Sequence, residues 1–450
     1  MSRKYNDYVN QWSHFKRLFE LCIADPTFYK EFISNPDEVA RRVRLAVDVA
    51  MAKDSIKNYI SGIESKPRLF NPYTCLTHIY VRRAQAAIRS RANLDNIRNQ
   101  NFRAWFLRRR DKAQFDSYKL RNNQQFEFIP ICFELSHGCS GECEFCCLNP
   151  PRFSGNFVYN LENGKLWWDV LGVCSDVVGR VVCSGACYFA TEPFDNPDYE
   201  RFIIDFHRMF GHYPQTTTVK ALEDVNRTKG LLRLIGDEQL RNAVVRFSVI
   251  SKKQLEKIHS TFSPKEIESV ELLLNNPESM NGYTLAGRAF QLQGKLPTKR
   301  FFTNTTSVCV LGFVVNMYQQ SIKLVSPRNP CAHYPNGMRT HEVTYFADKS
   351  SFESSLHKLI DKWMKQEIQR DERLVVDTEY ERKENYLTFR GDRIHRTIGA
   401  SETLFQSLKL FSEGYTMGEA IKKRGIPVYE QARLSEFVQM LYDFGYIDIA

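Results

Sequence analysis

Residues 129–147 read IPICFELSHGCSGECEFCC, and the interpretation of the whole chain starts from this stretch. The first seven residues, IPICFEL, form a short apolar run that predicts a buried β-strand. Directly after it, four cysteines fall within nine residues, and the first three have the spacing C-x3-C-x2-C. A loop in this position lies at the carboxyl end of a strand, where parallel α/β folds carry their chemistry.

Composition and length indicate a globular protein of several domains. The chain has 450 residues, of which 43% are hydrophobic and 25% charged, and this length predicts two or three domains. It contains no apolar run of about eighteen residues and no apolar N-terminal segment, so we predict neither a transmembrane helix nor a signal peptide. The expected location is cytoplasmic, without a membrane partner. Twelve cysteines in that compartment indicate metal, redox or catalytic use rather than disulfides.

Positive charge is concentrated in one segment. The chain carries a net charge of +10, and residues 81–121 contain twelve Lys or Arg against three Asp. Such a block suits an acidic partner such as nucleic acid. It is more typical of a solvated helix face that also packs on the next domain.

Three regions follow from the hydrophobic pattern. Residues 1–125 have apolar positions at helical spacing and predict a helical N-terminal domain. In residues 126–345, apolar runs alternate with helical segments, which predicts an α/β fold with a partial parallel (β/α)6 barrel. The predicted strands are 129–135, 180–185, 216–222, 244–251, 269–274 and 308–317.

Residues 346–450 predict a small C-terminal module. A linking helix at 352–369 precedes two short strands, 385–389 and 392–398, which are joined by a turn. Three helical segments follow, and Gly414, Gly425 and Gly445 are expected to end them. This order predicts a winged-helix-like module.

The cysteine spacing favours an iron–sulfur cluster. Cys139, Cys143 and Cys146 can ligate three irons of a [4Fe–4S] cluster, which leaves one iron open for a cofactor or substrate. Zinc is the alternative, with Cys147 as a further ligand. It is disfavoured because the chain lacks the second C-x2-C pair that zinc sites use.

The motif C-x3-C-x-aromatic-C resembles the signature of the radical S-adenosylmethionine (SAM) enzymes. The resemblance covers residues 126–325 and implies that SAM binds the open iron, is cleaved by one electron, and yields a 5′-deoxyadenosyl radical that abstracts a hydrogen atom. It implies the three cysteines as ligands and Phe145 as a shield over cluster and adenine. A reducing partner such as flavodoxin or ferredoxin is then required.

Further positions are similar to that family's SAM-binding elements. The stretch from Ala190 to Pro193 resembles its Gly-Gly-Glu-Pro element, which implies that Thr191 and Glu192 hold the methionine amino group. Ala-Thr replaces Gly-Gly here, and a surface carboxylate before a turn proline is the other interpretation of Glu192. Ser248 matches the position of a polar residue for the ribose hydroxyls, although a strand serine bonded to backbone fits the same pattern.

The sequence narrows the reaction class by what it lacks and by one late cysteine. It has neither the seven-cysteine extension of sactipeptide and quinohaemoprotein maturases nor an Asp-x-His-x-x-Gly cobalamin motif. Cys331 lies in the stretch 324–337, which is predicted to be a loop after the last barrel strand. This combination resembles the proteusin (polytheonamide-type) peptide epimerases, which convert L- into D-residues in a ribosomal precursor peptide. The resemblance implies Cys331 as the thiol that returns a hydrogen atom, with Cys183 and Cys187 as rivals and an ordinary packed cysteine as the other interpretation.

The C-terminal module is similar to the leader-peptide-recognition domains of peptide maturases, which bind the leader as an added strand. A structural cap is the alternative, and DNA binding is disfavoured because the last helix carries few basic residues. Other radical SAM reactions on a peptide, such as cross-linking or C-methylation, stay open, as does a non-catalytic iron–sulfur protein that binds nucleic acid.

Overall fold

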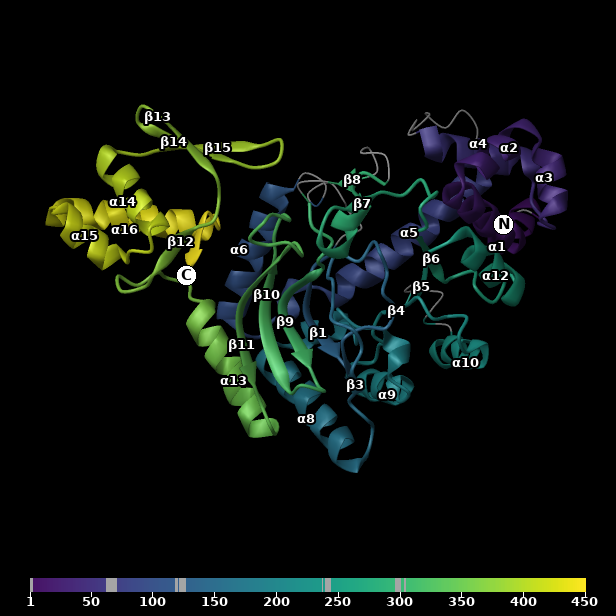
Figure 1. Cartoon of the computed structure of the whole chain (residues 1–450), viewed down its shortest axis with the longest axis horizontal. Coiled ribbons are helices and arrows are strands. Elements are labelled where there is room, and N and C mark those ends of the chain that lie inside the picture. Colours follow the sequence, from purple (N-terminus) through teal and green to yellow (C-terminus); the bar gives the residue numbers. More distant parts are fainter. Residues whose placement is uncertain are drawn as a thin grey trace. The chain divides into compact units, whose positions relative to one another are not determined.

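The computed structural model describes residues 3–61, 71–117, 120, 127–236, 238, 244–295, 301–302 and 305–450. These residues form a mixed α/β fold (Figure 1), and the chain divides into two compact units. Unit 1 comprises residues 1–91, 133–164 and 183–302, and unit 2 comprises residues 92–132, 165–182 and 303–450. The units therefore divide the chain differently from the predicted domains 1–125, 126–345 and 346–450, and the predicted boundary at 125/126 lies outside the described residues. Lys119 and Arg121 of the basic segment also lie outside them.

Unit 1 begins with a helical bundle, as predicted. Apolar side chains at helical spacing, including Trp12, Phe15 and Leu18, form its buried core. Asp25 ends the first helix and caps the second by accepting a hydrogen bond from the backbone N–H of Thr27 (2.9 Å). The helices are α1 (Arg3–Ala24), α2 (Pro26–Ser34), α3 (Pro36–Arg42), α4 (Val49–Ser61) and α5 (Pro72–Arg91).

A parallel sheet forms the second part of unit 1. Its order is β4-β5-β6, with Thr217 opposite Arg246 and Ser248 opposite Leu273. Helices α10 and α12 lie between successive strands in the chain, and α9 precedes β4, so three of the predicted strands are confirmed together with their crossovers. The bounds are α9 (Tyr199–Phe210), β4 (Thr216–Thr218), α10 (Val225–Ile235), β5 (Val245–Val249), α12 (Lys252–Thr261) and β6 (Glu271–Leu274).

The predicted strand at 180–185 is wrong. Residues Arg180–Ser184 form a 3-10 helix, η2, because a short buried apolar run such as Val181-Val182 fits a buried helical turn as well as a strand. The neighbouring Ala186 occupies the strand position instead. Its carbonyl accepts from the Phe133 N–H (2.8 Å), and it forms a parallel bridge with Gln215 just before β4.

The sixth predicted strand lies in a different sheet. Strand β9 (Val310–Asn316) is confirmed, but it belongs to unit 2, in a sheet with the order β1-β9-β10-β11. Strand β10 (Ser321–Pro327) is antiparallel to both β9 and β11 (Met338–Tyr345). The described residues form no closed barrel. Strand β1 (Ile129–Glu134) is confirmed, with the Ile129 N–H donating to the Cys309 carbonyl (2.9 Å).

Helices cover this sheet in unit 2. Helix α6 (Gln100–Asp116) packs against β9 and β10, and α13 (Lys349–Trp363) packs against β10, β11 and α6. The rings of Phe102 on α6 and Phe313 on β9 stack at 5.5 Å. Helix α8 (Leu161–Val177) contributes most of its length to the same unit.

The C-terminal module has the predicted strands and helices and three further strands. Sheet β13-β14-β15 is antiparallel, and β12 pairs with β16. Gly414, Gly425 and Gly445 have positive φ at the ends of the three helices, as expected for C-caps. The elements are β12 (Leu374–Val376), β13 (Tyr380–Lys383), β14 (Tyr386–Arg390), β15 (His395–Gly399), α14 (Glu402–Ser412), α15 (Met417–Arg424), α16 (Val428–Asp443) and β16 (Ile447–Ile449).

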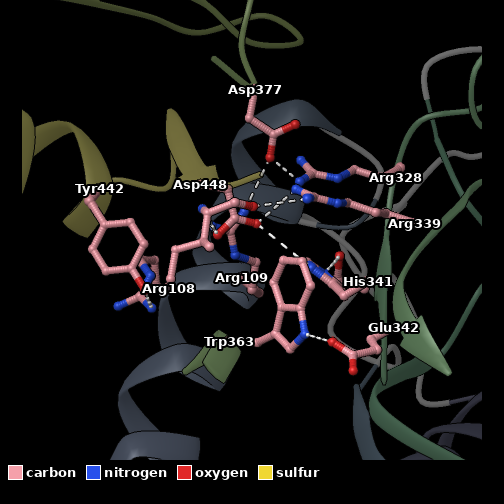
Figure 2. A network of polar contacts seen from close by, with 12 residues as sticks. Arg108, Arg109, Arg328, Arg339, His341, Glu342, Trp363, Asp377, Tyr442 and Asp448 are labelled. Atoms are coloured by element: carbon pink, nitrogen blue, oxygen red, sulfur yellow. Dashed lines mark hydrogen bonds and ion pairs between the residues drawn. The ribbon is translucent and has the colours of Figure 1, made fainter. Parts of the chain in front are cut away.

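Buried ion pairs join this module to the rest of unit 2 (Figure 2). Arg109 of α6 pairs with Asp377 (3.2 Å) and Asp448 (2.8 Å), and its side chain is 1% exposed. Arg328 pairs with Asp377, and Arg339 pairs with Asp448 (3.0 Å). The loop end of the β10–β11 hairpin is thereby fixed to Asp377, which follows β12, and to Asp448, which lies in β16. Burial of such pairs leaves each charge dependent on its partners.

The basic segment is therefore only partly a surface. The side chains of Arg108, Arg109 and Lys112 are buried in α6, and Arg108 donates to the Tyr442 hydroxyl (2.7 Å). Arg82 and Arg83 of α5 are exposed. Within the described residues, no helix is long and apolar enough to cross a membrane.

Candidate functional site

The cysteine segment is a loop closed at its neck. Strand β2 (Ser136–His137) pairs with β3 (Gly155–Asn156), and the Cys139 N–H donates to the Pro151 carbonyl (3.0 Å). Gly138 has φ +76°, and a Cβ there would lie 2.2 Å from the Arg152 carbonyl oxygen. Only glycine allows the two sides of the neck to approach so closely.

The sulfurs of Cys139 and Cys143 lie around one point of this loop. A Cβ placed on Gly141 would be 3.4 Å from the Cys139 Sγ and 3.6 Å from the Cys143 Sγ. The same position is 3.1 Å from a methyl group of Val219, just after β4. A glycine between two thiols leaves room at this point, and the three predicted ligands are all half-buried. These features fit a cluster whose thiolates bind different irons.

The zinc alternative needs four donors around a single ion. In the described part of the chain, no three His, Cys, Asp or Glu side chains converge in a way that could hold one metal ion. Cys147 is half-buried beside Cys146, and its carbonyl oxygen would lie 2.2 Å from a Cβ on Gly287.

A second segment supports the end of the loop. The Arg288 N–H donates to the Cys146 carbonyl (2.9 Å). The Arg288 side chain donates to the Asn149 side chain (3.0 Å) and the Pro150 carbonyl (3.1 Å). The ring of Phe145 stacks on Tyr283 at 6.2 Å with an interplanar angle of 15°. The predicted shield residue thus has an aromatic neighbour from the segment before Arg288.

Burial raises the pKa of two of these thiols. The pKa of Cys139 rises to about 11, mainly through burial and with smaller contributions from the Glu192 and Asp195 carboxylates, while the Gly141 N–H that donates to its sulfur acts against the rise. The pKa of Cys143 rises to about 12, first through burial and then through the neighbouring Cys139 and Cys146. The same carboxylates lie close enough to act on a charge carried by this loop.

Glu192 is buried at the carboxyl end of β4, where three groups donate to it. They are the Thr218 hydroxyl (2.5 Å), the Val219 N–H (3.0 Å) and the Phe194 N–H (3.1 Å). Burial raises the pKa of Glu192 to about 7, although these three hydrogen bonds lower it. Glu192 is therefore buried and is not a surface carboxylate before a turn proline, whereas its contact with β4 was not predicted.

Two carboxylates of this site were missed from the sequence. Glu134, the last residue of β1, accepts from the Ala190 N–H (2.8 Å) and so fixes the segment before Glu192. Asp195 accepts from both the N–H (2.9 Å) and the hydroxyl (2.5 Å) of Ser140. The available signal was their position: one ends the first strand, and the other follows Glu192 by three residues.

The predicted roles of Thr191 and Ser248 in SAM binding stay predictions. Thr191 is half-buried next to Glu192. Ser248 is buried in β5, one residue before its end, opposite Leu273 of β6. Both positions belong to unit 1, as the cysteine loop does.

The surroundings of Cys331 differ from the expectation. Residues 324–327 continue strand β10, so Cys331 lies in the loop of an antiparallel hairpin rather than after a parallel barrel strand. It is exposed, and it exchanges backbone hydrogen bonds with Tyr334 (3.1 and 3.3 Å). Cys331 belongs to unit 2, whereas the rivals Cys183 and Cys187 are buried in unit 1.

Comparison with known proteins places the chain in a family. No protein-family model matches it. It is 32% identical over 371 residues to the uncharacterized protein y4wI of Sinorhizobium fredii, and the match covers 78% of this chain and 70% of that protein. The chain belongs to the same family as y4wI.

One solved structure is similar in part. A crystal structure of BtrN in complex with AdoMet and 2-DOIA matches 52% of this chain and 87% of that chain, at 12% identity and a TM-score of 0.30. A score of this size does not define a shared fold, so the site of this chain is argued from its own residues.

Proposed function

We propose that this protein is a radical SAM enzyme, with a [4Fe–4S] cluster on Cys139, Cys143 and Cys146 and SAM at the open iron. The observation that carries the proposal is the closed loop after β1, in which two of the three sulfurs surround Gly141. The partial (β/α)6 barrel of that family is the fold we propose for residues 126–345. The strands β4 to β6 and the bridge at Ala186 support it.

When bound and reduced, the cluster would supply the electron that cleaves SAM. The residues of the chain would bind and orient the cofactor. A carboxylate offers about four acceptor positions. Three donors already occupy three of these positions on Glu192. One acceptor position is left for the methionine ammonium. Ser248 would contact the ribose, and Phe145, backed by Tyr283, would limit water at the adenine.

Within this class, we propose epimerisation of residues in a ribosomal precursor peptide. Bound SAM would supply the radical chemistry that removes an α-hydrogen from one face, and a thiol of the chain would return a hydrogen atom to the other face. The sulfur radical left on that thiol would regain one electron from the reducing partner and one proton from solvent. Cys331 is the proposed donor because its thiol is exposed on the loop between β10 and β11. A small electron carrier such as flavodoxin or ferredoxin would reduce the cluster.

The C-terminal module is proposed to bind the leader of the precursor. Within the described residues, β14 is the central strand of the sheet β13-β14-β15, so an extended peptide could add to β13 or β15. Amide hydrogen exchange of the full chain with and without leader peptide tests this. Added protection in β13 or β15 supports strand addition, and protection confined to other segments would argue against it.

Deletion of the C-terminal module would not test leader binding, because the module also carries buried ion-pair partners. Removing residues from 375 onward would delete Asp377 and Asp448 and leave Arg109, Arg328 and Arg339 buried without their partners. Such a chain is expected to lose stability for reasons unrelated to the leader.

The decisive test of epimerisation is a reaction in deuterium oxide. The reconstituted, reduced enzyme with SAM and precursor peptide should give a mass gain of one deuterium per inverted residue and no mass change in ordinary water. A gain of methyl groups would indicate C-methylation, and a loss of two hydrogens would indicate cross-linking. The nucleic-acid alternative has less support, since Arg108, Arg109 and Lys112 of the basic segment are buried.

A further inference from the structure

Ser140, between the first ligand and Gly141, is held by both oxygens of one carboxylate. Its N–H donates to Oδ2 of Asp195 (2.9 Å), and its hydroxyl donates to Oδ1 (2.5 Å). The Asp195 carbonyl in turn accepts from the Asn156 side chain (2.8 Å) at the neck of the loop. Two hydrogen bonds from one residue to a carboxylate fix both the position and the orientation of the backbone there.

Asp195 is a buried charge with one cationic neighbour. Its side chain is 3% exposed, and Lys220 lies 3.1 Å from Oδ1. Lys220 also pairs with Glu223 (3.1 Å), whose side chain is 65% exposed. Both oxygens of Asp195 accept hydrogen bonds from Ser140, the residue directly after Cys139, so this carboxylate lies beside the proposed ligands. Charges in such a poorly solvated place act more strongly than on the surface.

We propose that Asp195 is a positioning residue of the cluster, because it holds the cysteine loop through Ser140. Its negative charge beside the ligands lowers the reduction potential of the cluster, and the positive charge of Lys220 partly offsets this effect. The inference rests on the proposed function, since it concerns the cluster that Cys139, Cys143 and Cys146 would bind.

The sign of the effect follows from the charge that the cluster gains. Reduction moves one electron from the reducing partner to the cluster and makes the cluster and its thiolates more negative by one charge. A fixed carboxylate nearby opposes that step, and a fixed ammonium favours it. Removal of Asp195 and removal of Lys220 should therefore shift the potential in opposite directions.

A redox titration of the reconstituted protein, followed by electron paramagnetic resonance, tests this at about pH 8. Asp195→Asn should raise the midpoint potential enough to change the ratio of reduced to oxidised cluster several-fold. Lys220→Gln should lower it. Asp198→Asn is the matched control because its carboxylate accepts from the Tyr159 N–H instead of the cysteine loop. Shifts of the same sign for the two test variants, or no shift, would overturn the electrostatic role.

Amide hydrogen exchange of the metal-free chain separates this inference from the proposed function. Ser140→Ala and Asp195→Asn should speed exchange at Ser140 and Gly141 about tenfold to a hundredfold, and Lys220→Gln should not. Unchanged exchange in both Ser140→Ala and Asp195→Asn would overturn the positioning role. If the chain binds no cluster but exchange at Ser140 and Gly141 still depends on Asp195, then the proposed function and the redox role fail. The positioning of the cysteine loop by Asp195 would remain supported.

Discussion

Replacing Glu192 with glutamine should remove a pH dependence from the stability of the chain. The carboxyl group is 4% exposed, and burial raises its pKa from 4.5 to about 7. In the folded chain it therefore binds its proton more tightly than in the unfolded chain. Its contribution to stability is fully present below about pH 4.5 and is lost as the pH rises through about 7.

The magnitude follows from these two values. A carboxyl group with a pKa of about 7 when folded and 4.5 when unfolded changes the free energy of unfolding by about 3 kcal/mol across this range. Glutamine has no such proton, and its side chain retains an oxygen that accepts from the donors around it. The variant should thus be less pH-dependent than the wild type by about this amount.

Urea unfolding of the metal-free, reduced chain between about pH 5 and 8 measures the difference. Glu223→Gln serves as control, because that side chain is 65% exposed. Identical pH profiles of the wild type and Glu192→Gln would refute the reasoning about burial. With the cluster present, Glu192→Ala should weaken SAM binding about tenfold to a hundredfold, as expected for the loss of a charge-assisted hydrogen bond; an unchanged dissociation constant would remove Glu192 from the SAM site.

Three further predictions concern other parts of the chain. Asp448→Asn should lower the free energy of unfolding by about 3–5 kcal/mol, because Arg339 loses its carboxylate partner and the buried Arg109 keeps only Asp377; Asp443→Asn, on the exposed side of α16, should change it little in the same urea titration. Gly287→Ala should reduce iron incorporation on reconstitution, since the new Cβ would lie 2.2 Å from the Cys147 carbonyl oxygen; full iron content would contradict this. Cys331→Ala should still release 5′-deoxyadenosine but form no D-residues, and D-residues with solvent deuterium would place the donor elsewhere.

Hydrophobic runs and glycine positions in the sequence were enough to predict several strands and the ends of the C-terminal helices. Strands β1, β5 and β6 lie in short runs rich in apolar residues, β4 consists of three β-branched threonines, and the C-terminal helices end at glycines with positive φ. The 3-10 helix at Arg180–Ser184 was misread because burial, and not strand pairing, explains its apolar residues. Strand β11 was missed because Arg339 to Glu342 are four polar residues in a row, although the β-branched residues and the tyrosine of MRTHEVTY favour a strand.

Long-range contacts were beyond such patterns. Arg109 was counted with a basic surface segment, yet its partners Asp377 and Asp448 lie in the C-terminal module. Burial of a charge depends on partners that the fold brings together, so local spacing carries no signal for it. The hydrogen bonds between Ser140 and Asp195 are also long-range contacts that local patterns do not reveal, since 55 residues separate the two.

The central claim is that Cys139, Cys143 and Cys146 hold a cluster that cleaves SAM. Anaerobic reconstitution of the triple Cys→Ala variant tests it most directly, with Cys147→Ala as the matched control from the same loop. The wild type and the control should bind about four irons and four sulfides and release 5′-deoxyadenosine from SAM on reduction, and the triple variant should do neither. An unchanged iron–sulfur spectrum in the triple variant would contradict the claim.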